Sequence, residues 1–150
     1  MEIMSTLVPQ LIILRGPIGA GKTSVAECLR DFIKDVSLVD FDTFKRMIDN
    51  SKSSDWRRKI ALDTALYMTE RLMQQKRLIV VDIHSSKQDQ LEAYTSLAQA
   101  HGYQYASYLI QPPLDECIRR ATKRIVPDIR YPIDEKMINE YWQNTVYIKG

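Results

Sequence analysis

Short apolar runs alternate along most of the chain with longer segments in which apolar residues recur at helical spacing. The runs have the length and composition of buried strands, and they cover Leu11 to Leu14, Ser37 to Asp40, Leu78 to Asp82 and Tyr105 to Ile110. Val146 to Ile148 is a candidate for a short final strand. Because strands and helices alternate, the pattern predicts an α/β fold, a parallel sheet of about five strands with helices on both faces.

The helical segments have apolar faces that we expect to pack against this sheet. One helix carries Val25, Leu29, Phe32 and Ile33, and a long helix from about Asp55 to Gln75 carries Ile60, Thr64, Tyr67, Met68 and Met73. Further helices are expected before Gly102, after Pro113, and around Met137 to Trp142. Cys28 and Cys117 lie on apolar helix faces, which indicates two buried thiols in a reducing compartment.

The composition indicates a single domain spanning residues 1–150, since a chain of this length can build one hydrophobic core. Hydrophobic residues make up 45% and charged residues 27%, and the net charge is only +2, so composition alone requires neither a nucleic acid nor a membrane. No apolar run approaches the length that spans a bilayer, and Met1 to Pro9 lacks the pattern of a signal peptide. We therefore expect a cytoplasmic protein.

Three of the five glycines fall within the segment Gly16-Pro17-Ile18-Gly19-Ala20-Gly21-Lys22-Thr23, which fits the phosphate-binding pattern G-x-x-x-x-G-K-[ST]. The segment joins a predicted strand to a predicted helix, which is the context that the pattern requires. Glycines let the backbone N–H groups turn toward phosphate oxygens, and the helix N-terminus adds positive partial charge. The alternative is an ordinary glycine-rich turn.

This motif predicts the residues that bind ATP and Mg²⁺. The nucleotide should contact the loop and the start of the helix: Gly16, Pro17, Ile18, Gly19, Ala20, Gly21, Lys22, Thr23 and Ser24. The Lys22 ammonium should reach the β- and γ-phosphates, and the Thr23 hydroxyl should bind Mg²⁺.

Carboxylates follow the second and third predicted strands where those strands end. Asp40 and Asp42 follow the second strand, and Asp82 and His84 follow the third. In a parallel sheet these ends share the edge at which ligands bind. We therefore expect these groups to face the transferred phosphate, with Asp42 taking a proton from the acceptor and Asp82 binding Mg²⁺ or substrate.

Other roles remain open for three of these residues. Asp42 could be a cap of the helix that begins beside it and have no catalytic role. Asp40 could be a second ligand or a carboxylate in solvent. His84 could contact the substrate or form local hydrogen bonds only.

A basic cluster follows the fourth predicted strand and comprises Arg119, Arg120, Lys123, Arg124 and Arg130. Arg120 and Arg124 are one helical turn apart and share a face, whereas Arg119 and Lys123 are expected on the solvated side. The arrangement is typical of a small lid, at approximately residues 119–133, whose arginines donate to the γ-phosphoryl oxygens.

Three segments resemble the P-loop kinases that include the 5′-hydroxyl polynucleotide kinase domain and the zeta-toxin-like kinases. The segments are Val39 to Lys45, Leu78 to His84 and Asp115 to Arg124. The resemblance implies that Asp42 is the catalytic base, that Lys45 is a cation on the acceptor side, and that Arg120 and Arg124 are lid arginines. Lys45 departs from the arginine usual in the polynucleotide kinases.

These observations predict an ATP-dependent kinase with Lys22, Asp42, Arg120 and Arg124 as catalytic residues. Its acceptor would be a small molecule such as a nucleotide sugar, nucleoside or antibiotic, contacted by residues of the strand ends and the lid: Asp40, Lys45, Asp82, His84 and Arg130. The low net charge favours a small acceptor over a polynucleotide, which needs a basic track.

Two other functions remain open. A 5′-hydroxyl polynucleotide kinase could use Trp56-Arg57-Arg58-Lys59 as a basic-aromatic contact, although this segment could equally be a solvated helix start. The alternative of a different class is a nucleotide-dependent switch or an ATPase that has no acceptor and so needs no base at Asp42.

Overall fold

The computed structural model describes residues 10–17, 20–49, 54–84 and 88–122, together with positions 136, 139 and 143. In these ranges the elements follow one another as β1 (Gln10–Gly16), α1 (Lys22–Phe32), β2 (Val36–Asp40), α2 (Phe41–Ile48), α3 (Asp55–Gln74), β3 (Leu78–His84), α4 (Gln88–Ala100), β4 (Gln104–Leu109) and α5 (Leu114–Thr122). The predicted alternation of strands and helices is confirmed. The candidate strand at Val146 to Ile148 and the candidate helix around Met137 to Trp142 lie outside the described residues, apart from position 139.

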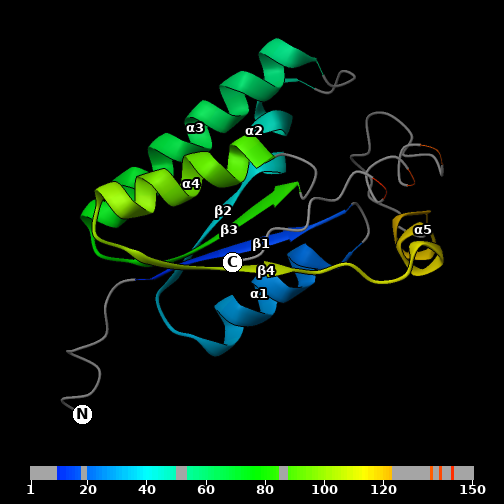
Figure 1. The fold of residues 1–150 in the computed structure, drawn as a ribbon, viewed down its shortest axis with the longest axis horizontal. Coiled ribbons are helices and arrows are strands. Elements are labelled where there is room, and N and C mark those ends of the chain that lie inside the picture. Colours follow the sequence, from blue (N-terminus) through cyan, green and yellow to red (C-terminus); the bar gives the residue numbers. More distant parts are fainter. Residues whose placement is uncertain are drawn as a thin grey trace.

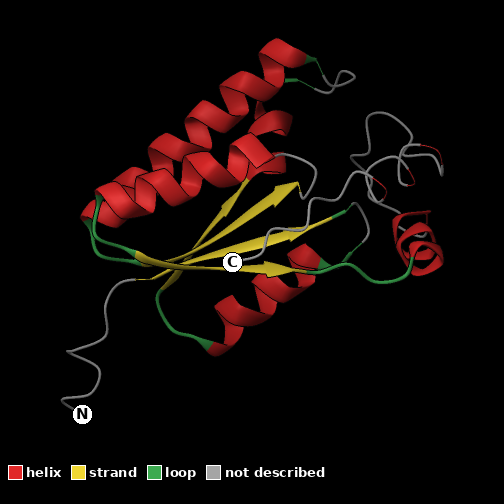
Figure 2. Cartoon of the chain, viewed as in Figure 1, coloured by secondary structure: helices red, strands yellow, loops and turns green. Residues whose placement is uncertain are grey.

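The strands form a parallel sheet in the order β2-β3-β1-β4. Four strands are therefore found in the described part of the chain, where the sequence led us to expect about five. Figures 1 and 2 show α1 on one face of the sheet and α3 and α4 on the other, with α5 beyond the end of β4. Since the strands are parallel, their last residues lie at the same edge of the sheet: Gly16, Asp40 and His84. Asp40 pairs in register with Asp82.

Alternate residues of the central strands supply two hydrophobic cores, as expected for a sheet covered on both faces. Leu11, Ile13, Ile79 and Val81 pack with residues of α3 and α4 in the larger core. Leu14 and Val80 pack with Ala26 of α1 in the smaller one. Both cores therefore hold the strand ends in register.

The predicted inner face of α3 is largely wrong. The helix buries a row of every fourth residue: Arg57, Ala61, Ala65, Thr69 and Met73. Of the predicted set only Met73 is buried, whereas Tyr67 is 66% exposed. Two alanines and a threonine in the row have side chains small enough for a helix to pack closely on its neighbours.

The inner face of α1 also differs from the prediction. Ala26 is buried and Leu29 packs beside it, but Phe32 is 84% exposed. Cys28 is exposed as well, so the expectation of two buried thiols is confirmed for Cys117 only. Cys28 lies two positions from Ala26, which places it on the far side of a helix with 3.6 residues per turn.

Among the described residues, no helix is both long enough and apolar enough to cross a membrane.

Candidate active site

The glycine-rich segment joins the end of β1 to the first turn of α1. Gly21 adopts a left-handed conformation (φ 96°) at the helix N-cap. At Gly16 a Cβ atom would lie 2.1 Å from the carbonyl oxygen of Ile110, a contact that excludes any other residue unless the backbone moves. Both glycines are thus required by local geometry. Ile18 and Gly19 lie outside the described residues.

The start of α1 is open to an anionic ligand. Gly21 provides no side-chain cap, and the first turn has no acidic residue. Thr23 is half-buried in that turn, and Ser24 is exposed. The first N–H groups of a helix have no partner within the helix and favour anions, so this turn can bind phosphate.

Lys22 lies between the loop and the end of β3. Its Nζ donates to the carbonyl oxygen of Gly16 at 2.6 Å and lies 3.7 Å from Oδ1 of Asp82. The structure therefore brings together a loop lysine and a strand-end carboxylate that are far apart in sequence. The ammonium is positioned at the mouth of the predicted phosphate site.

Asp82 is a buried carboxylate, with a side chain only 12% exposed. Burial raises the pKa of Asp82 from 3.8 to about 7; Lys22 opposes this change, and the nearby charges of Asp40 and Asp42 add to it. Three carboxylates thus lie close enough to influence one another. A divalent cation would relieve their repulsion.

The donors suit Mg²⁺ shared with a nucleotide rather than a metal held by the protein alone. Within the described ranges, no group of three His, Cys, Asp or Glu side chains is arranged to hold a metal ion. Mg²⁺ commonly takes one or two protein oxygens and completes its shell with water and substrate phosphates. The Asp82 carboxylate and the Thr23 hydroxyl are oxygen donors of this kind.

Asp40, and not Asp42, is the cap of α2. Its Oδ1 accepts from the N–H of Asp42 at 3.1 Å, and its Oδ2 accepts from the hydroxyl of Thr43 at 2.9 Å. Asp40 therefore has a structural role at the end of β2. Asp42 lies inside the first turn of α2, with a side chain 55% exposed.

Lys45 lies one turn further along α2 and faces Asp42. Its Nζ is 3.6 Å from Oδ1 of Asp42 and 5.5 Å from the centre of the Phe41 ring. Burial lowers the pKa of Lys45, and the Asp42 carboxylate partly offsets this effect. The structure thus places together the two residues that the resemblance assigned to the acceptor side.

The predicted lid residues are not placed by the structure. Arg124 and Arg130 lie outside the described residues, as do the side chains of Arg120 and His84. Arg119 is described: its guanidinium donates to both carboxylate oxygens of Glu116 on the exposed side of α5. This arrangement agrees with the prediction that Arg119 faces solvent.

The sequence argument did not assign a structural role to two arginines that have one. Arg15, near the end of β1, is buried and donates to the hydroxyl of Ser107 on β4 at 2.7 Å. Burial lowers the pKa of its guanidinium. Arg57 is buried and bonded to α2, so it is neither a solvated helix start nor a nucleic-acid contact. The position of Arg15, directly after the apolar run Leu11 to Leu14 and before Gly16, was a signal for the first. Arg57 has no comparable local signal.

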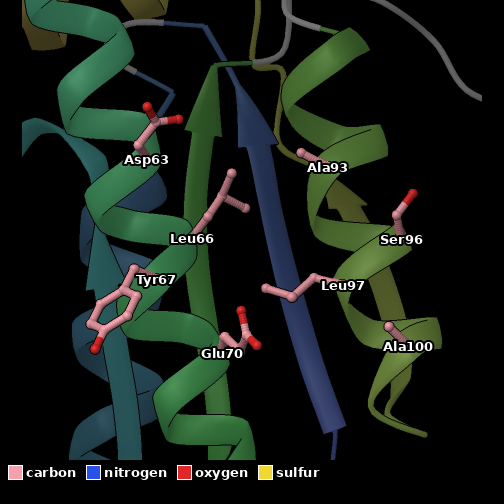
Figure 3. A pocket seen from close by; sticks show the side chains of 8 residues that line it. All are labelled: Asp63, Leu66, Tyr67, Glu70, Ala93, Ser96, Leu97 and Ala100. Carbon is pink, nitrogen blue, oxygen red and sulfur yellow. The ribbon is translucent and has the colours of Figure 1, made fainter.

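A groove of about 510 Å³ lies between α3 and α4 (Figure 3). Its lining combines carboxylates with apolar and small side chains: Asp63, Leu66, Tyr67, Glu70, Ala93, Ser96, Leu97 and Ala100. None of these residues belongs to the phosphate-loop site. The groove is therefore separate from the candidate active site.

A parallel sheet whose first strand leads through a glycine-rich loop into a helix, with a loop lysine beside a strand-end carboxylate, defines a phosphate-loop nucleotide-binding protein. The chain belongs to the AAA domain family, whose model matches residues 11–144. A search of curated proteins finds no match.

Similar solved structures include several kinases. A chain of the Pnkp1/Rnl/Hen1 RNA repair complex is 19% identical, with a TM-score of 0.80, and the match covers 92% of this chain and 44% of that one. A sugar kinase from Janibacter sp. HTCC2649 is 12% identical, with a TM-score of 0.67 and coverage of 93% and 79%. The Mycobacterium tuberculosis APS kinase CysC, in complex with AMPPNP and APS, is 20% identical, with a TM-score of 0.61 and coverage of 77% and 70%.

These likenesses show that the chain has the α/β fold of P-loop kinases. The chain spans less than half the length of the RNA repair protein that it matches.

We predict that the nucleotide-free protein loses stability as the pH rises from about 5 to about 8, with Asp82 as a cause. The pKa of Asp82 is raised to about 7, so between the unfolded and folded pKa values the folded protein keeps a proton that the unfolded chain has released. This stabilisation is complete below the unfolded pKa and is lost as the pH rises through about 7. The variant Asp82→Asn lacks this effect. Its free energy of unfolding should therefore rise by about 2 kcal/mol relative to that of the wild type over this range. Urea unfolding of both proteins, with a chelator present, measures the difference; a difference that does not change with pH would contradict the assignment.

Proposed function

We propose that the protein is an ATP-dependent kinase that transfers the γ-phosphoryl group to a hydroxyl of a small molecule. The observation that carries the proposal is the convergence of two charged pairs on one edge of the sheet. Lys22 is the first residue of α1 and lies beside Asp82 near the end of β3. Asp42 and Lys45 lie on α2, which starts where β2 ends. Such an edge is where ligands bind in open α/β sheets.

The first pair serves the nucleotide in this proposal. The backbone of the loop and the first turn of α1 bind the phosphates, and Lys22 exchanges its bond to the Gly16 carbonyl for the β- and γ-phosphates. Thr23 and Asp82 would hold Mg²⁺, which neutralises charge on the phosphoryl oxygens when it is bound. The neighbouring carboxylates provide the negative potential that attracts the cation.

The second pair serves the acceptor. Asp42 accepts the proton of the acceptor hydroxyl while the oxygen of that hydroxyl forms a bond to the γ-phosphorus. The bond from that phosphorus to the bridging oxygen breaks, and ADP leaves with the electron pair. Lys45, held beside Asp42, provides a positive charge for an anionic or polar acceptor. Arg120 and Arg124 would close over the transferred group, and Arg130 and His84 would contact the substrate.

A polynucleotide 5′-hydroxyl is the second candidate acceptor, supported by the fold likeness to the RNA repair protein. The three cations at the start of α3 that could form a basic track each have a partner within the chain. Arg57 is buried, Arg58 pairs with Asp55, and Lys59 lies 3.3 Å from Asp63. This observation favours a small acceptor, because a nucleic-acid backbone needs available cations.

We predict that radiolabelled ATP transfers its γ-phosphoryl group to at least one compound in a panel of nucleosides, nucleotide sugars, aminoglycosides and 5′-hydroxyl oligonucleotides. The variant Lys22→Ala should lower transfer at least about a hundredfold, because it removes a charge from the phosphates. It should fold, with a lower melting temperature because Asp82 loses its paired charge. Chromatography of the labelled products identifies the acceptor class. ATP hydrolysis with no labelled acceptor would favour the ATPase alternative, and labelling confined to oligonucleotides would favour the polynucleotide kinase.

The variant Asp42→Asn should lower transfer by about a hundredfold, since the amide cannot accept the proton. Its affinity for ATP should stay within about twofold, because Asp42 lies on the acceptor side in this proposal. Titration with a fluorescent ATP analogue and steady-state kinetics measure the two quantities separately. A collapse of ATP binding with unchanged transfer per bound ATP would make Asp42 a ligand of the magnesium nucleotide.

For the lid we predict that Arg124→Ala lowers kcat by at least about tenfold and changes the KM for ATP less, because its donors act on transition-state charge. Arg119→Ala is the matched control, since the Arg119 guanidinium is already paired with Glu116 on the exposed side of α5. Kinetics of the two variants at saturating acceptor make the comparison. Equal effects would mean that the basic cluster acts only as a diffuse positive surface.

A further inference from the structure

The helix α2 is short and carries both residues of the proposed acceptor pair. Its first turn is fixed to the end of β2 by the Asp40 cap and by the buried Phe41 ring. The last turn of any helix leaves carbonyl oxygens without partners within the helix. In α2 these carbonyls lie close to Lys45, so the way in which they are satisfied bears on the position of Lys45.

Arg57, in the first turn of α3, binds one of them, the carbonyl of Lys45, and also the carbonyl of the C-cap residue Asp49. Its Nε and Nη2 both donate to the carbonyl oxygen of Lys45, at 3.2 and 2.9 Å, and Nη2 also donates to the carbonyl oxygen of Asp49 at 2.5 Å. Nε lies 3.1 Å from Oδ1 of Asp49. The Arg57 side chain is only 2% exposed, so a full positive charge is buried against the negative end of α2.

The choice of arginine has a physical reason. A buried charge is costly unless several partners compensate it, and a planar guanidinium can donate to several acceptors at once. A lysine would supply a single point charge, and an apolar residue would leave the Lys45 and Asp49 carbonyls unsatisfied. The planar guanidinium of Arg57 therefore joins the last turn and the C-cap of α2 to α3.

We propose that Arg57 is a positioning residue for phosphoryl transfer, which clamps the last turn of α2 and thereby fixes Lys45 and Asp42 at the acceptor site. The inference rests on the proposed kinase function. It follows because the carbonyl of Lys45 is held directly, while its Nζ is 3.6 Å from the Asp42 carboxylate. Burial is the main cause of the lowered pKa of Lys45, and the positive charges of Arg57 and Arg58 contribute to it.

The nucleotide side should be insensitive to Arg57. Lys22 is positioned by Gly16 on β1 and by Asp82 on β3, not by α2. Loss of the Arg57 contacts should therefore lower kcat/KM for the acceptor and leave the affinity for ATP unchanged. A general loss of stability would not make this distinction.

The test compares Arg57→Met, which keeps the length and removes the donors, with Arg57→Lys and two controls. Met73→Ala creates a cavity at the other end of α3, roughly 24 Å along the helix axis. Arg58→Met removes the neighbouring, partly exposed arginine, which pairs with Asp55. Melting temperatures allow Arg57→Met and Met73→Ala to be compared at temperatures with equal folded fractions.

Two readouts are expected to move together in Arg57→Met. Amide hydrogen exchange should speed up at least about tenfold in residues 41–49 relative to β1 and β3. Transfer to the acceptor identified in the panel should lose about tenfold to a hundredfold in kcat/KM for that acceptor, as expected for a misplaced catalytic group, with the Kd for ATP within about twofold. Arg57→Lys should give intermediate values, and both controls should leave α2 exchange and acceptor kinetics near those of the wild type.

The proposed role of Arg57 is contradicted if amide hydrogen exchange in α2 is as fast in Arg57→Met as in Met73→Ala. It is also contradicted if both variants lose transfer equally. If Arg57→Met does not fold, Arg57→Lys decides by the same two readouts. Failure of the proposed function is distinct, because the wild type itself would then transfer nothing. Hydrogen exchange still decides in that case whether Arg57 holds α2, and the claim of a role in transfer falls.

Discussion

The buried carboxylate of Asp82 is the constraint around which the site is arranged. A carboxylate at the end of an interior strand raises the free energy of the folded protein unless a positive group lies beside it. Lys22, the first residue of α1, supplies that charge, with its Nζ 3.7 Å from Oδ1 of Asp82. In-register pairing of Asp40 with Asp82 adds a second carboxylate nearby. The same pairing that builds the parallel sheet therefore concentrates charge at one edge, where a magnesium nucleotide would compensate it.

A second constraint acts on α2, which is held at both ends by polar contacts. Asp40 caps its first turn, and Arg57 bonds to its last carbonyls from another helix. These contacts hold the first turn, which carries Asp42, and the last turn, which carries Lys45. Apolar packing of Phe41 and Phe44 adds to these polar contacts. The polar anchors thus link the stability of α2 to the geometry of the proposed catalytic pair.

The errors of the sequence argument have a common cause. Helical spacing identified α3 but assigned its larger apolar residues to the core, whereas the structure buries the row that runs from Arg57 through Ala61 to Met73. Periodicity ranks residues by hydrophobicity and does not measure how closely two backbones approach. Arg57 was grouped with its basic neighbours for the same reason. Its carbonyl partners belong to α2 and have no signal in the side-chain pattern.

The sequence by itself determined the α/β class, the strand-loop-helix unit around Lys22, and the strand ends at which Asp40 and Asp82 lie. These features follow from local patterns: apolar runs, glycine spacing, and polar residues where the runs stop. Only the tertiary structure decided that Lys22 lies beside Asp82, that Asp40 caps α2, and that Arg57 is buried against the Lys45 carbonyl. Such contacts depend on strand order and on the approach of separate helices, and a single sequence contains no direct measure of either.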